Sequence, residues 1–271
     1  MTPGVRLGTE PSRAARWLIL GSVGLLFAIP IVAMVEFTFR AGLQGGYTLE
    51  NWAAIVDPEL NAKYRQLFTA VGNSVALAIV TVAIVLFVLL PTMVLVHLQF
   101  PRLRRVLEFV CIIPITVPAI VLVVGLAPVY SVVVKLFGTS AWTLAFAYGI
   151  IVLPFAYRAI QSNLQAIDLL TLSEAARSLG AGWMSVLWLI LLPNLRRGIL
   201  AASFISVAVV LGEFTIASLL NRSNLQTALV QVSKSDAYAA VIFALMALLF
   251  VFALLLILGR IGSSARDRKL L

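Results

Sequence analysis

The sequence is poor in charge, cysteine and histidine, and each scarcity excludes a class of function. Only 11% of its 271 residues are charged, about half the share of a soluble domain. The single cysteine, Cys111, excludes an intrachain disulfide and a multi-cysteine metal site, and the single histidine, His97, excludes paired-histidine ligation. The sequence also lacks a GxxxxGK[ST] phosphate-binding loop and a Ser/His/Asp or metal constellation. We therefore expect no catalytic residue, metal site or cofactor in this chain.

Apolar residues fill most of the sequence. They make up 62% of the chain, and the mean hydropathy is +1.06, which is typical of an integral membrane protein. Each helical span needs about 20 predominantly apolar residues, so the length leaves room for roughly five to seven spans. The apolar runs are continuous, whereas the strands of a membrane β-barrel alternate apolar and polar residues. The sequence therefore predicts an all-α integral membrane fold.

Six apolar runs are candidate transmembrane helices, at about 17–39, 67–96, 106–127, 142–157, 198–220 and 238–259. Pro114 and Pro118 should kink the third run. Residues 128–141 are expected to form an amphipathic segment outside the membrane, and 221–237 a polar loop. We divide the chain into an N-terminal segment (1–16), a six-span domain (17–259) with a long polar loop at about 158–197, and a C-terminal tail (260–271).

The basic residues are distributed unevenly between the loops on the two sides of these six helices. One side holds fourteen Lys and Arg residues, including both termini and the loop at 158–197, and the other side holds six. Loops rich in Lys and Arg stay in the cytoplasm, so both termini are predicted to be cytoplasmic. This asymmetry explains much of the net charge of +9 without a nucleic-acid partner.

The loop at 158–197 carries the most specific motif in the sequence. It reads Glu174-Ala175-Ala176, then Gly180-Ala181, then Ile190-x-Leu192-Pro193. This pattern resembles the EAA signature of the permease subunits of bacterial ATP-binding-cassette (ABC) importers of type I, and all of its fixed positions match. The position of the motif before the penultimate span also agrees with that family.

The residues of this motif also favour a compact helix and turn. Asp168 or Ser173 can cap a short helix, and the two alanines, Ala175 and Ala176, allow another surface to approach closely. Gly180 can adopt a left-handed conformation and turn the chain. The resemblance implies that the motif couples the permease to an ATPase, through Glu174, Ala175, Ala176, Gly180, Ala181 and Pro193. The alternative is an ordinary surface hairpin.

The resemblance also implies a set of partners and a location. We expect a second homologous permease subunit, two copies of an ABC ATPase that bind ATP and Mg, and an external substrate-binding protein. The chain is then a multi-pass protein of the bacterial inner membrane that catalyses no covalent chemistry itself. A membrane-embedded enzyme or a secondary carrier is a weaker alternative, because neither explains the EAA motif.

A second segment narrows the family. Residues 211–220, which read LGEFTIASLL, are similar to permeases of the spermidine/putrescine type, whose close relatives also move ferric iron, phosphonates and opines. The resemblance thus favours a polyamine substrate. A sulfate- or molybdate-like anion is a further alternative that would leave the permease assignment intact.

Glu213 is the one acidic residue well inside an apolar run. A carboxylate within a membrane is costly unless it is paired or hydrated, so it is the best candidate for the substrate pathway. Phe214, Trp142 or Tyr148 could add cation–π contacts to an amine substrate if they face the same cavity. The alternative is that Glu213 only forms a hydrogen bond to a neighbouring helix or to the second permease.

Overall fold

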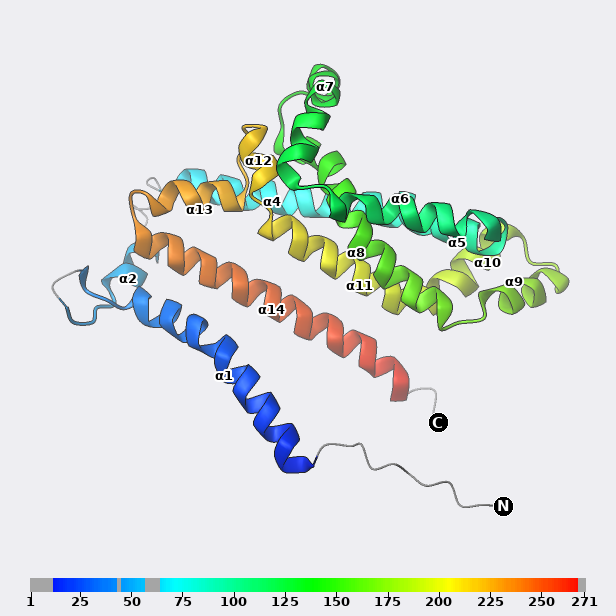
Figure 1. Cartoon of the computed structure of the whole chain (residues 1–271), viewed down its shortest axis with the longest axis horizontal. Coiled ribbons are helices and arrows are strands. Elements are labelled where there is room, and N and C mark those ends of the chain that lie inside the picture. The colour runs from blue at the N-terminus through cyan, green and yellow to red at the C-terminus, as the bar shows by residue number, and fades with distance from the viewer. Residues whose placement is uncertain (1–11, 43–44, 57–63, 268–271) are drawn as a thin grey trace.

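The computed structural model describes residues 12–42, 45–56 and 64–267, and in these ranges the chain is helical (Figure 1). Within the described residues, the only strand-like pairing is an isolated bridge between Arg40 and Tyr47. The prediction of an all-α fold is therefore confirmed. Most of the predicted N-terminal segment and the last four residues of the tail lie outside the described residues.

Five helices within the described residues are long and apolar enough to cross a membrane. They are α1 (Arg13–Thr38), the continuous helix Arg65–Leu98, α7 (Ala119–Phe137), the continuous helix Ala141–Gln165 and the continuous helix Trp183–Gly212. The last long helix, α14 (Ala237–Asp267), contains a shorter apolar stretch, Ala237–Ala253. The shorter elements are α2 (Glu50–Val56), a 3₁₀ turn (Pro101–Leu103), α6 (Arg104–Thr116), α9 (Leu169–Ser178), α12 (Thr215–Leu219) and α13 (Leu225–Ser233). The count of six spans remains a prediction.

Three of the continuous helices are built from smaller pieces. Arg65–Leu98 consists of α4 (Arg65–Ile84), a π-helical turn (Val85–Leu89) and α5 (Leu90–Leu98). Ala141–Gln165 consists of a 3₁₀ turn (Ala141–Leu144) and α8 (Ala145–Gln165). Trp183–Gly212 consists of α10 (Trp183–Val186), a π-helical turn (Leu187–Leu191) and α11 (Leu192–Gly212).

The core of the molecule lies where α8, α11 and the α4–α5 helix pack together. Tyr148 and Leu195 are fully buried there. The backbones of α8 and α11 approach so closely that the Gly198 N–H donates a hydrogen bond to Asn163 Oδ1 at 3.3 Å. A Cβ atom at Gly198 would lie only 2.8 Å from the Cβ of Asn163, so this crossing requires glycine. Helix α1 lies at the edge of the molecule and packs on α14, where Phe37 stacks on Tyr238 at 4.9 Å.

The ends of the long helices gather on two sides of the molecule (Figure 1). In Figure 1, α9, the end of α5 and the end of α14 lie toward the right, whereas α2 and α13 lie toward the left. Helices α1 and α14 pack on each other in opposite directions, so the start of α1 lies on the same side as the end of α14. We call the side that contains α9 the α9 end. Which side of the membrane it faces remains a prediction.

The prediction that the third span is a single kinked helix is wrong. Helix α6 ends at Thr116 and α7 begins at Ala119, because Val117 is extended (φ −100°, ψ 121°). A residue before proline is disfavoured in the helical conformation, and Pro118 follows Val117. Pro114, by contrast, is accommodated inside α6. The run at 106–127 therefore contributes to two helices that point in different directions (Figure 1).

The prediction of a separate amphipathic segment at 128–141 is also wrong. Helix α7 continues through Pro128 and ends only at Phe137, because the aliphatic residues that follow Pro128 extend the helical run. The helix stops at Gly138, whose φ of +77° lies in the left-handed region that favours glycine. This arrangement leaves only residues 138–140 between α7 and the 3₁₀ turn that leads into α8.

The fourth and fifth predicted spans have different ends in the structure. Helix α8 continues to Gln165 rather than stopping near Tyr157, and the fifth helix begins at Trp183 and ends at Gly212 rather than running from 198 to 220. The apolar residues 183–192 extend the fifth helix at its start. The predicted polar loop at 221–237 contains α13, whose first turn is closed by a capping box between Asn224 and Thr227.

Candidate functional site

The predicted coupling segment forms helix α9, and this helix begins at one of the two residues expected to cap it. The Asp168 carboxylate accepts hydrogen bonds from the Thr171 backbone N–H at 3.2 Å and from the Thr171 hydroxyl at 2.7 Å. The hydroxyl and the N–H stabilise the ionised carboxylate and hold the pKa of Asp168 below its ordinary value. Ser173, the other candidate cap, lies buried within the helix.

Gly180 ends α9 with the turn that its position in the motif predicts. Its φ is +86°, in the left-handed region. The Gly180 N–H donates to the Arg177 carbonyl at 2.9 Å, and the Ala181 N–H donates to the Ala176 carbonyl at 3.1 Å. These two bonds form a Schellman motif, which satisfies two of the carbonyl groups at the end of the helix. The chain then turns directly into α10.

Helix α9 has one face buried against its own chain and one face exposed. Ser173 and Ala176 are on the buried face, and Ala176 belongs to a cluster that includes Val186 of α10. Ala176 thus permits the close approach of α10, while Ala175, on the opposite face, remains exposed. Glu174 is exposed too, so its carboxylate is accessible to a partner.

Pro193, the last residue of the motif, follows the π-helical turn at the start of α11. The Leu192 N–H donates to the Leu187 carbonyl five residues back, instead of four. Proline has no N–H, and its ring clashes with the carbonyl four residues earlier in a regular α-helix. The wider turn accommodates that ring, so α10 and α11 form one continuous helix from Trp183 to Gly212.

Glu213, the main candidate for the substrate pathway, lies at a break between helices. Helix α11 ends at Gly212, the backbone of Glu213 is extended (φ −85°, ψ 126°), and α12 begins at Thr215. Both carboxylate oxygens accept a hydrogen bond from the Ile216 N–H, at 3.0 and 3.1 Å. The carboxylate therefore satisfies a free N–H at the start of α12. The expectation that Glu213 lies within a continuous fifth span is wrong.

A buried amide connects Glu213 with Tyr148. Asn224 Nδ2 donates to the Tyr148 hydroxyl at 3.1 Å and to the backbone carbonyl of Glu213 at 2.8 Å. The structure thus brings together two of the four predicted pathway residues, through an asparagine that the sequence reasoning missed. The signal available for Asn224 was the Asn-x-x-Thr spacing of its capping box.

The other two predicted pathway residues have different surroundings. Trp142 makes an edge-to-face contact with Phe137 at 5.8 Å and lies 6.4 Å from the ring of Phe146. Phe214 directly follows Glu213 in the chain, and 39% of its surface is exposed. The aromatic contacts of Trp142 are thus made with the end of α7 and the start of α8.

The same region holds the start of α13 against α4. The Ser74 hydroxyl accepts a hydrogen bond from the Leu225 N–H at 2.7 Å, and Asn73 Nδ2 donates to the Ser223 carbonyl at 2.9 Å. Ser74 is almost fully buried. These contacts, together with those of Asn224, join α4, α8 and the α11–α12 break into one polar cluster inside an apolar molecule.

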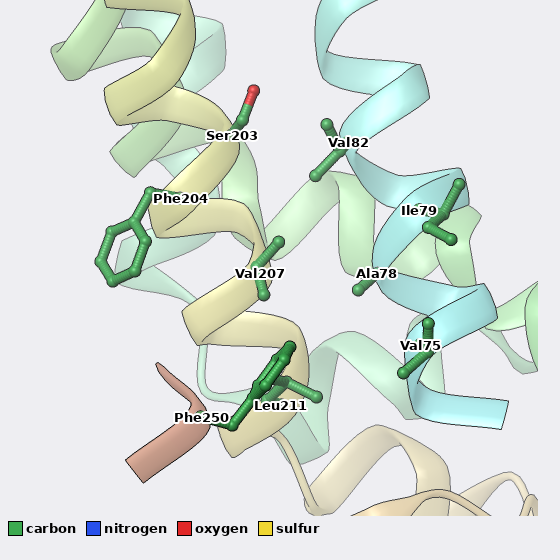
Figure 2. A pocket seen from close by; sticks show the side chains of 9 residues that line it. All are labelled: Val75, Ala78, Ile79, Val82, Ser203, Phe204, Val207, Leu211 and Phe250. Atoms are coloured by element: carbon green, nitrogen blue, oxygen red, sulfur yellow. The ribbon is translucent and has the colours of Figure 1, made fainter. Parts of the chain in front are cut away.

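Two cavities differ sharply in chemistry. A cavity of about 380 Å³ between α4 and α11, shown in Figure 2, is lined by Val75, Ala78, Ile79, Val82, Ser203, Phe204, Val207, Leu211 and Phe250. Its only side-chain polar group is the Ser203 hydroxyl, so it offers no partner for a charged substrate. A second cavity, of about 450 Å³, is largely polar and is lined by Asn73, Ala76, Thr139, Ser140, Ala141, Trp142, Asn221, Arg222 and Ser223. We call it the Arg222 pocket.

The long apolar helices and the capped helix and turn of the EAA motif together define an integral membrane permease subunit. Residues 94–270, well over half of the chain, match the family of binding-protein-dependent transport system inner membrane components. The chain belongs to this family. The matched region includes both the coupling segment and Glu213.

Three curated proteins are similar to parts of this chain. A probable ABC transporter permease of Sinorhizobium fredii is 26% identical over 277 residues, which cover 95% of this chain and 48% of that protein. The phosphate transport system permease protein PstA of Pasteurella multocida is 31% identical over 115 residues, covering 42% of this chain and 40% of that protein. The chloroplastic sulfate permease 2 of Chlamydomonas reinhardtii is 37% identical over 78 residues, covering 29% and 21%. The chain thus spans about half the length of the first relative, and less of the others. All three are named as permeases, which are transport components rather than enzymes.

Proposed function

We propose that this chain is one permease subunit of an ATP-driven importer, and that α9 and the turn at Gly180 dock onto a separate ATPase. The capped helix that ends in a left-handed glycine carries this proposal, because the turn falls at the glycine of the EAA motif. A second permease subunit completes the pathway, two ATPase copies bind ATP and Mg, and an external binding protein delivers the substrate. Membership of the family supports an ATPase and a binding protein as partners.

Exposed apolar side chains on α9 and α10 support this docking role. Leu179 is 89% exposed, and Leu170 and Met184 are 47% and 67% exposed. These residues flank the exposed Glu174 and Arg177, so the surface combines apolar area with charge of both signs. An apolar core with a polar rim is the usual composition of a protein interface. The occupant that the family assignment favours is the ATPase.

A substitution at Leu179 tests this surface. Burial of a leucine side chain contributes about 1.5–3 kcal/mol, so Leu179→Ser should weaken ATPase binding by about 10- to 100-fold. The measurement is the amount of ATPase retained on the purified permease, together with ATP hydrolysis after reconstitution into liposomes. Leu49→Ser is the matched control, because Leu49 is 70% exposed and precedes α2, away from the α9 end. Equal loss in both variants, or a purified assembly with no ATP-hydrolysing subunit, would refute the proposal.

The proposed orientation places the α9 end and both chain termini in the cytoplasm. Single-cysteine labelling tests this directly because the natural Cys111 is buried. In intact cells, a membrane-impermeant maleimide should label Ser235→Cys, beyond α13, and should label Ser178→Cys, on α9, only after permeabilisation. The opposite pattern would reverse the orientation and remove α9 from the compartment that contains ATP.

The substrate proposal needs revision from the polyamine that the sequence suggested. That suggestion came from the resemblance of residues 211–220 and placed a free Glu213 carboxylate opposite an amine, but this carboxylate already accepts a hydrogen bond from the Ile216 N–H. The two relatives named for a substrate are named for phosphate and sulfate. We therefore propose an inorganic oxyanion as the substrate class, ahead of a polyamine. A thermal-shift screen of the partner binding protein decides between them: stabilisation by spermidine or putrescine alone would restore the polyamine.

A further inference from the structure

The Arg222 pocket lies at the opposite end of the helix α8 from α9. Its walls come from α4, from the residues that lead into α8, and from the turn between α12 and α13. Since α8 runs from this pocket toward α9, the pocket lies at the end that the charge distribution predicts to be external. It is therefore placed where a substrate would enter the membrane subunit.

Arg222 carries the only formal charge among the residues that line this pocket. Its backbone is fixed by the end of α12: the Arg222 N–H donates to the Ala217 carbonyl at 2.8 Å, and the Asn221 N–H donates to the Ser218 carbonyl at 3.1 Å. Asn221 adopts a left-handed conformation, with φ of +53°, and completes a Schellman motif. This turn holds Arg222 at a defined place on the pocket wall.

The guanidinium group of Arg222 has unused hydrogen-bonding capacity. One terminal nitrogen donates to the Asn221 carbonyl at 3.3 Å, whereas Nε is buried and has no hydrogen-bond partner among the described residues. Buried N–H groups without an acceptor are rare in folded proteins. No carboxylate lines this pocket. An external acceptor with negative charge would balance the charge of Arg222 and accept hydrogen bonds from the terminal N–H groups of its guanidinium.

The rest of the pocket wall supplies further donors of the right kind. Thr139, Ser140 and Ser223 contribute hydroxyl groups, and Asn73 contributes an amide that uses one N–H on the Ser223 carbonyl. The forked guanidinium group matches two oxygens of a phosphate or sulfate group, and neutral hydroxyl and amide groups can satisfy the remaining oxygens. An amine or a metal cation would instead meet an uncompensated positive charge.

We propose that the Arg222 pocket binds a tetrahedral oxyanion, a phosphate or sulfate group, with Arg222 as its principal ligand. This inference rests on the proposed importer function for its biological meaning, because it gives the entering substrate a first binding site on the permease. The same chemistry could come from the headgroup of an anionic phospholipid, since the pocket lies near the end of a membrane helix. The experiment must therefore separate a free oxyanion from a lipid.

Binding is measured on the full-length chain, delipidated in a maltoside detergent that contains no phosphate. Radiolabelled phosphate and sulfate are titrated in one arm, and a short-chain phosphatidic acid is titrated in the other. Arg222→Gln should weaken binding by about 10- to 100-fold, the range for losing hydrogen bonds to a charged partner. Arg222→Lys, which keeps the charge but loses the fork, should retain intermediate affinity. Lys234→Gln is the matched control, because it removes the same charge from an exposed residue outside the pocket.

Each outcome decides the proposal. Arg222-dependent binding of phosphate or sulfate supports a substrate site, and binding of the lipid alone supports the oxyanion chemistry but assigns it to a headgroup. Absence of binding in both arms, or equal loss in Arg222→Gln and Lys234→Gln, overturns the proposal. The melting temperature of each ligand-free variant shows whether it folds, and Arg222→Lys tests the site if the glutamine variant does not. Binding to this chain needs no ATPase, so its failure would leave the coupling experiment at Leu179 unaffected.

Discussion

Substitution of Gly180 gives the sharpest test of the coupling turn. Its φ of +86° is unfavourable for a residue with a Cβ, yet a Cβ built there would meet no atom within 4 Å. The penalty for a side chain therefore comes from the backbone alone. A left-handed conformation costs an L-residue about 1–2 kcal/mol. Replacing glycine also restricts the unfolded chain, which stabilises the folded state by about 0.4–1 kcal/mol. The net destabilisation of the turn by Gly180→Ala is therefore about 1 kcal/mol.

This energy acts on the turn rather than on the whole fold. Gly180→Val should exceed the alanine penalty, because a β-branched residue is an outlier at positive φ, whereas Gly180→Asn should be the mildest change. About 1–2 kcal/mol lowers the population of the correct turn by roughly 5- to 30-fold. We therefore expect substrate-stimulated ATP hydrolysis and uptake to fall in the order glycine, asparagine, alanine, valine.

Gly182 provides the matched control, two residues along the same loop. Its φ of −70° suits any L-residue, and a Cβ there would also meet no atom within 4 Å. Gly182→Val should therefore leave stimulated ATP hydrolysis in proteoliposomes near that of the parent. If Gly180→Val retains parental hydrolysis and uptake, or if the two valine variants lose equal activity, a left-handed turn is not what couples this subunit to the ATPase.

Three further predictions concern single side chains. Glu213→Ala should lower the free energy of unfolding by about 1–2 kcal/mol because the Ile216 N–H loses its acceptor, and Glu213→Gln should lower it less. A selective loss of cation uptake with an unchanged melting temperature would instead restore the pathway role of Glu213. Asn224→Ala should lower the free energy of unfolding more, by about 2–3 kcal/mol by thermal melting, because it removes a helix cap and leaves the partly buried Glu213 carbonyl without its donor. Because the pKa of Asp168 is lower in the folded state, its ionised carboxylate stabilises the fold. This stability is fully present at a pH above the unfolded pKa of about 3.9, and it is lost as the pH falls through the lower pKa of the folded state. Asp168→Asn keeps a cap without the titration, so its melting temperature should change less than the parent's over that acid range.

The parts of the fold that depend on neighbouring residues could be predicted from the sequence. The cap at Asp168 and the turn at Gly180 each involve contacts within five residues, and both were identified from residue type and spacing. The long apolar runs likewise gave the correct class of fold, because a membrane helix satisfies its own backbone. The orientation and the number of spans depend on the bilayer and remain predictions.

The position of Glu213 could not be predicted in the same way. Residues 198–220 are almost continuously apolar, so the sequence gives no local reason for the helix to stop at Gly212. The break is held by Asn224, which lies 11 positions away in the sequence and also donates to Tyr148, 65 positions from Glu213. An acid that looked isolated in a span is thus part of a polar cluster built from distant segments. The Arg222 pocket was missed for the same reason, since its walls come from three separate stretches of chain.

Proline had three different structural outcomes that composition alone does not distinguish. Pro118 ends a helix because Val117 before it is extended, while Pro114 remains inside α6. Pro91 and Pro193 each follow a leucine and a π-helical turn, and each lies within a continuous helix. In both turns an N–H donates to the carbonyl five residues back, which accommodates the proline ring without ending the helix. The Leu-Pro pair of the EAA motif therefore has a local structural role: it lets α10, which packs against α9, continue directly into the long helix α11.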